Sequence, residues 1–99
     1  MIKKKPKLKK WDVINYLKTE KDIVGFLEAA FEIGGDDPEY IAKVLGKVAR
    51  ARGMSKLARD TGISREGLYK ALSGDGNPEF ATILKVMRAL GLKLSATPI

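Results

Sequence analysis

The segment from Met54 to Leu92 constrains the fold of this chain most, because its polar residues and glycines mark the ends of three short helices. Ser55 is placed to cap a helix that Gly62 ends, and Ser64 is placed to cap a second helix. Gly62 supplies a positive φ angle, and Ile63 fills the corner between the two helices. The inward positions are Leu57 and Ala58 in the first helix and Leu68, Ala71 and Leu72 in the second. This spacing is typical of a helix-turn-helix, whose second helix projects from the surface.

A long helix is expected to begin after Thr19, where Asp22 can complete a capping box, and to end at Gly34 and Gly35. Its apolar residues spread over an arc of about 220 degrees, which is wider than one core-facing stripe. They are Ile23, Val24, Phe26, Leu27, Ala29, Ala30, Phe31 and Ile33. The helix is therefore expected to pack on its own domain with one flank and on a second surface with the other. That surface is the apolar segment around Trp11, another copy of this chain or a different protein; cover by the Trp11 segment needs the fewest assumptions.

Two further helices are indicated by their capping residues. Asp37 as cap with Pro38 at the first position predicts a helix that runs to about Arg52. Its apolar face is Ile41, Val44, Leu45 and Val48, and its opposite face carries Lys43, Lys47 and Arg50. We expect that basic face to be mainly solvated and the helix to act as a scaffold. Asn77 as cap with Pro78 at the first position predicts the last helix.

The last helix has an apolar stripe at helical spacing and is expected to end at Gly91. The stripe consists of Phe80, Ile83, Leu84, Met87 and Leu90. After it, residues 92–95 alternate in the manner of a short terminal strand or an extended tail. The glycines before this helix do not form a phosphate loop, because no strand precedes them and no Gly-Lys-Ser or Gly-Lys-Thr follows.

The formal charge of +7 is distributed unevenly along the 99 residues. Residues 1–18 carry a net charge of +6, residues 19–40 carry −6 and residues 41–99 carry +7. The basic last part holds the expected helix-turn-helix, so it can neutralise phosphates and bind nucleic acid. The acidic middle part opposes such binding and is expected to face away. The lysine-rich arm, residues 1–10, is expected to be disordered, either as a solvated tail or as a contact to phosphates or a partner.

The chain contains no cysteine and no histidine. Their absence removes most catalytic and metal-binding arrangements, so neither an enzyme nor a cofactor or metal site is expected. No apolar run approaches the roughly 20 residues of a membrane span, and the lysine-rich start lacks the apolar segment of a secretory signal. We therefore expect a cytoplasmic protein without a membrane partner.

The residues of the helix-turn-helix also carry a family resemblance. The strings Ser64-Arg65-Glu66-Gly67-Leu68-Tyr69-Lys70 and Gly76-Asn77-Pro78-x-Phe80 resemble those of addiction-module antidote proteins, which are small HigA-like antitoxins with a Cro/C1-type (Xre) helix-turn-helix. The resemblance covers roughly residues 11–96. It implies a bacterial antitoxin that represses its own operon, lies on the nucleoid when bound to DNA and neutralises a RelE/ParE-like toxin.

The expected fold is all-α: a five-helix Cro/C1 (lambda repressor-like) DNA-binding domain with an extra N-terminal helix and a flexible basic arm. Its expected parts are the arm at residues 1–10, an N-terminal helical extension at 11–36 and the helix-turn-helix domain at 37–96. Because one short helix in a groove gives little specificity, a homodimer on palindromic double-stranded operator DNA is expected, with half-sites about 34 Å apart. The dimer surface is either the last helix with its tail or the wide apolar helix after Thr19.

The second helix of the motif supplies the expected base contacts, because its first turns enter the major groove. The DNA-binding residues are Arg65, Glu66, Tyr69 and Lys70 at base edges, and Ser55, Lys56 and Ser64 at backbone phosphates. Arg65 suits a bidentate contact to guanine, Glu66 can accept from cytosine or orient Arg65, and Lys70 can reach guanine or phosphate. Two alternatives remain: a stand-alone helix-turn-helix regulator, and a helical protein-interaction module that does not bind DNA.

Overall fold

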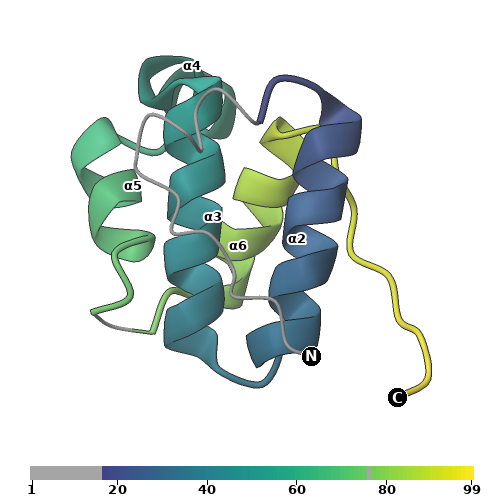
Figure 1. Ribbon diagram of the computed structural model, residues 1–99. Coiled ribbons are helices and arrows are strands. Elements are labelled where there is room, and N and C mark those ends of the chain that lie inside the picture. The colour runs from purple at the N-terminus through teal and green to yellow at the C-terminus, as the bar shows by residue number, and fades with distance from the viewer. Residues whose placement is uncertain (1–16, 76) are drawn as a thin grey trace.

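The computed structural model describes residues 17–75 and 77–99, and these residues form five helices and no strand (Figure 1). The helices are α2 (Glu20–Gly34), α3 (Pro38–Arg52), α4 (Met54–Thr61), α5 (Arg65–Ala71) and α6 (Phe80–Ala89). The all-helical class is confirmed. The expected basic arm and the segment around Trp11 lie outside the described residues. None of the described helices has the length and apolar character needed to cross a bilayer.

Helix α3 stands in the middle of the molecule, with α2 on one side of it and α5 on the other (Figure 1). It packs against α2 and α4, while α4 also contacts α5 and α6. Every helix contributes to one core, whose fully buried larger side chains are Leu17, Ile23, Leu45, Val48, Leu68, Leu72 and Val86. Burying one side chain of this size stabilises the fold by about 1.5 to 3 kcal/mol. The core thus fixes the helices that carry the exposed residues described below.

Two of the expected helix starts are confirmed by their capping hydrogen bonds. At α2, the backbone N–H of Asp22 donates to Thr19 Oγ1 at 3.1 Å and the backbone N–H of Thr19 donates to Asp22 Oδ2 at 3.2 Å. At α3, Asp37 Oδ1 accepts from the backbone N–H groups of Glu39 and Tyr40 at 3.1 and 3.3 Å. These bonds satisfy amide groups that have no partner inside the helix.

The expectation that Ser55 caps the next helix is wrong. Helix α4 begins at Met54, its N-cap is Gly53, and no side chain caps it. Gly53, at φ 105°, donates its N–H to the Ala49 carbonyl at the end of α3 and accepts from the Leu57 N–H at the start of α4. One glycine therefore ends one helix and begins the next, which leaves no separate capping position.

The expectation that Asn77 and Pro78 begin the last helix is also wrong. Helix α6 begins at Phe80, and the N-cap is Glu79, whose backbone is extended and whose carbonyl accepts from the Ile83 N–H at 3.1 Å. The φ angle that proline imposes is shared by helix and extended chain, so a proline does not by itself fix the first helical residue. After α6, residues 92–95 form an extended tail and no strand.

Candidate nucleic-acid interface

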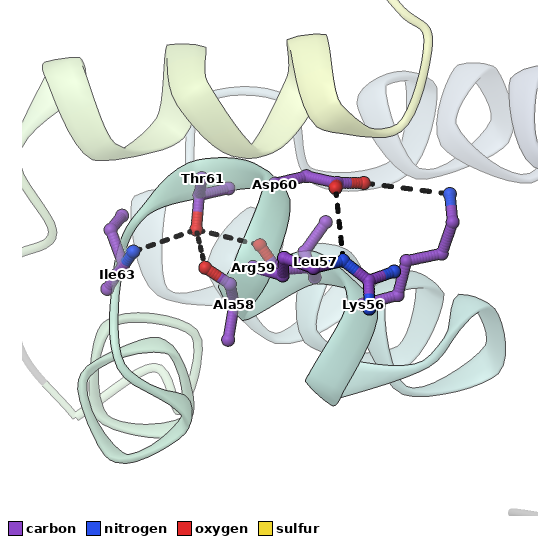
Figure 2. Close-up of polar contacts among 7 residues, drawn as sticks. All are labelled: Lys56, Leu57, Ala58, Arg59, Asp60, Thr61 and Ile63. Atoms are coloured by element: carbon purple, nitrogen blue, oxygen red, sulfur yellow. Dashed lines mark hydrogen bonds and ion pairs between the residues drawn. The ribbon is translucent and has the colours of Figure 1, made fainter.

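The turn between α4 and α5 is built from a glycine and a threonine. Gly62 has φ 75° and ψ 11°, and its N–H donates to the Ala58 carbonyl. The Thr61 hydroxyl donates to the Leu57 carbonyl at 2.8 Å and accepts from the Ile63 N–H at 3.1 Å, as Figure 2 shows. The predicted role of Gly62 is confirmed. The hydrogen bonds of Thr61 are not predictable from the sequence, because a threonine at a helix end has many alternative partners.

Ser64 is the N-cap of α5, as its position after the turn predicts. Its Oγ accepts from the backbone N–H of Gly67 at 2.9 Å. A Cβ atom at Gly67 would lie 3.1 Å from Ser64 Oγ and 3.2 Å from Ile63 Cγ2. Glycine at this helical position therefore leaves room for the cap and for the corner residue, which offsets its cost of about 1 kcal/mol in a helix.

Replacing Ser64 with alanine is expected to lower the free energy of unfolding by about 1 kcal/mol, because the Gly67 N–H loses its partner. Ser55→Ala is the matched control: Ser55 is also an exposed serine near a helix start, but it caps nothing. Its substitution is expected to leave stability unchanged or slightly raised. The midpoint of urea unfolding measures both variants, and equal losses would contradict the assignment of the cap.

One face of α5 is exposed to solvent and the other is buried. Leu68 is 0% exposed and belongs to the core. The four residues predicted to contact bases are all exposed: Arg65, Glu66, Tyr69 and Lys70. The three residues predicted to contact phosphates are also exposed: Ser55, Lys56 and Ser64. The fold thus presents the whole predicted set to solvent, on α4, α5 and the cap between them.

The charges of this surface are loosely paired. Lys56 Nζ lies 3.6 Å from Asp60 Oδ2, and Arg59 Nε lies 3.9 Å from Asp60 Oδ1 (Figure 2). Exposed pairs of this kind contribute about 0 to 1 kcal/mol, so Lys56 can exchange Asp60 for a phosphate at little cost. Within residues 17–75 and 77–99, neither Arg65 nor Glu66 forms an ion pair. In this structure, then, Glu66 does not orient Arg65.

Helix α3 contributes a contact to this surface that the sequence did not predict. The Arg50 guanidinium carbon lies 5.6 Å from the centre of the Tyr69 ring. Arg50 is half-buried, whereas its face of the helix was expected to be mainly solvated. A Cβ at Gly74 would lie 2.6 Å from Lys43 Cε. The Lys43 side chain therefore lies against the backbone just after the end of α5. One sequence feature could have indicated this contact. Residues spaced by three and four positions share one helix face, and this is the spacing of Lys43, Gly46 and Arg50. Two cations of α3 thus flank α5.

A model of a protein family matches residues 7–98 of the chain, and its description is "Probable addiction module antidote protein". The chain belongs to this antidote family. A relative from Haemophilus influenzae strain Rd, described as an uncharacterized protein, is 55% identical over 86 residues, which are 87% of this chain and 87% of the relative. No solved structure matches the chain. An antidote of an addiction module has, in general terms, a toxin as its partner.

The exposed residues of the antidote protein on α4 and α5 offer cationic groups, hydroxyls, two carboxylates and a phenol ring. In the part of the chain that the structure describes, no group of three or more carboxylates, histidines or cysteines could hold a metal ion. The groups that this surface offers act by hydrogen bonding and by charge. Such groups are suited to phosphates and to the edges of bases.

Proposed function

We propose that this antidote protein binds operator DNA of its own operon through α4 and α5, as a Cro/C1-type helix-turn-helix, and represses that operon. The observation that carries the proposal is the exposed face of α5, on which Arg65, Tyr69 and Lys70 stand together while Leu68 anchors the helix in the core. A rigid turn and a capped first turn hold that face in place. Helix α5 is the recognition helix and enters the major groove.

Each exposed side chain has a role that suits its chemistry. Arg65 donates two hydrogen bonds to guanine, Glu66 accepts from cytosine, and Lys70 reaches guanine or a phosphate. Tyr69, with Arg50 against its ring, contacts the base edges one turn further along. The phosphate contacts come from Ser55, Lys56 and Ser64. The two flanking cations of α3 add to the attraction between this face and the DNA backbone.

The binding unit that we propose is a symmetric dimer. A single α5 of seven residues covers only part of a groove. Two copies related by a twofold axis read a palindrome whose half-sites are about 34 Å apart, which multiplies the specificity of each half. In the same module, the antidote neutralises a RelE/ParE-like toxin. Family membership supports an antidote over a stand-alone regulator.

Fluorescence anisotropy with labelled duplexes tests the DNA-binding proposal. A duplex from the region upstream of the gene is expected to bind about 1,000-fold more tightly than a shuffled duplex of equal composition. Raising the salt concentration from 50 to 200 mM is expected to weaken binding to both duplexes, because the release of counterions from neutralised phosphates gains less free energy in concentrated salt. Equal affinity for the two duplexes would contradict specific binding to an operator. It would favour the alternative of a helical protein-interaction module that does not bind DNA.

A further inference from the structure

A groove runs between α2 and the C-terminal tail, on the side of the molecule away from α5. Its volume is about 730 Å³, and its lining includes the buried residues Leu27 and Met87. A second cavity, beside Arg52, has a volume of only about 20 Å³. Figure 1 shows α2 and the tail on one side of α3 and α5 on the other. A molecule in the groove would therefore leave the proposed DNA-binding face open.

The walls of the groove carry large apolar side chains that the described chain does not cover. Val24 and Phe31 of α2 are 40% and 43% exposed, and Leu94 of the tail is 41% exposed. Val24 and Phe31 belong to the flank of the wide apolar arc of α2 that the core does not bury. An apolar patch of this kind, rimmed by polar groups, marks a surface for a protein partner.

The charged groups of the groove are mainly acidic. Glu28 and Glu32 line it, with Lys93 as a cation among the lining residues. No described residue forms an ion pair with either glutamate. Residues 19–40, which include α2, carry a net charge of −6. The occupant that fits is a protein segment with cationic side chains and at least one apolar anchor.

We propose that this groove is the docking surface for the toxin, which contributes a basic segment with apolar side chains. The inference rests on the proposed neutralisation of a toxin and assigns a surface to it. The apolar side chains of the toxin cover Val24, Phe31 and Leu94, and its cations pair with Glu28 and Glu32. A second copy of this chain fits less well, because docking α2 on α2 about a twofold axis brings glutamates together.

Two pairs of matched variants test the docking surface by isothermal titration calorimetry with the toxin of the same operon. Phe31→Ser is expected to lower the affinity for the toxin about tenfold or more, as loss of a central aromatic contact does. Phe80→Ser is its control: Phe80 is 66% exposed but does not line the groove, and its substitution is expected to change the affinity less than about twofold. Unchanged binding of operator DNA shows that both variants fold.

The charge of the groove is tested in the same way. Glu28→Gln with Glu32→Gln is expected to weaken toxin binding and to flatten its dependence on salt, because two of the interfacial charges are removed. Glu39→Gln, an exposed glutamate at the start of α3, is expected to change neither. Toxin affinity that stays within twofold of wild type for both groove variants overturns the proposed surface. Absence of toxin binding by the wild-type chain overturns the proposed neutralisation itself, and the docking surface with it.

Hydrogen exchange identifies the occupant. Amides of residues 24–32 are expected to gain protection when the toxin is added. If they are protected in the free chain and deletion of residues 1–16 removes that protection, a segment within residues 1–16 of the same chain occupies the groove and the proposal is wrong. A change from dimer to monomer on Phe31→Ser, seen by sedimentation, would assign the groove to a second copy and would equally overturn it.

Discussion

Replacing Arg65 with alanine is expected to reduce affinity for the operator by about 1 to 3 kcal/mol, which is about 5- to 150-fold. Arg65 is the first residue of α5, it is exposed, and it forms no ion pair within the described residues. The proposed contact of its guanidinium with DNA therefore does not require an ion pair within the described residues to break first. Loss of a bidentate contact to one base also relaxes the preference for that base, so the ratio of operator to random affinity falls.

Two controls separate this specific contact from charge. Arg65→Lys keeps the charge but lacks the planar pair of donors. Compared with Arg65→Ala, it is expected to restore the general attraction to DNA but little of the preference for one base. Lys21→Ala removes one exposed charge from α2, on the other side of α3 from α5. It is expected to lower the affinity for all DNA sequences equally and only slightly. Competition binding against duplexes changed at one base pair at a time measures the preference. An equal loss on operator and random DNA for Arg65→Ala would contradict the assignment.

Replacing Gly46 with alanine is expected to lower the free energy of unfolding by about 1 to 3 kcal/mol, as other overpacked sites do. A Cβ at this position of α3 would lie 2.6 Å from the carbonyl oxygen of Leu72, at the end of α5. Because the neighbour is backbone, the end of α5 must move away from α3. That movement also displaces Tyr69 from Arg50, so weaker binding to the operator is expected together with the loss of stability.

Gly25→Ala is the matched control for Gly46→Ala, because both glycines lie inside long helices. A Cβ at Gly25 has no atom within 4 Å, and Gly25 is exposed. Its substitution is expected to raise the free energy of unfolding by about 0.5 to 1 kcal/mol, since alanine loses less backbone entropy in a helix. Urea unfolding followed by circular dichroism gives both values. A gain in stability for both variants would show that α3 and α5 are not in close contact at Gly46.

The helix ends that the sequence predicts correctly depend on local interactions. Thr19, Asp37 and Ser64 accept hydrogen bonds from residues two or three positions further along. Gly62 turns the chain through its own positive φ angle. The two errors, at Ser55 and at the start of the last helix, have another origin. Gly53 serves two helices at once, and the chain stays extended through Glu79, neither of which a single capping pattern indicates.

For the candidate site, the periodicity of α5 is sufficient to separate Leu68 from the exposed residues beside it, because helical spacing depends on the chain alone. The sequence by itself thus determined the helices, most of their caps and the face that α5 presents. Only the tertiary structure decided that Arg50 lies against Tyr69, that Gly46 admits the end of α5, and that α2 and the tail enclose an acidic apolar groove. Those features join residues far apart in the sequence, and their positions depend on how the core packs the helices together.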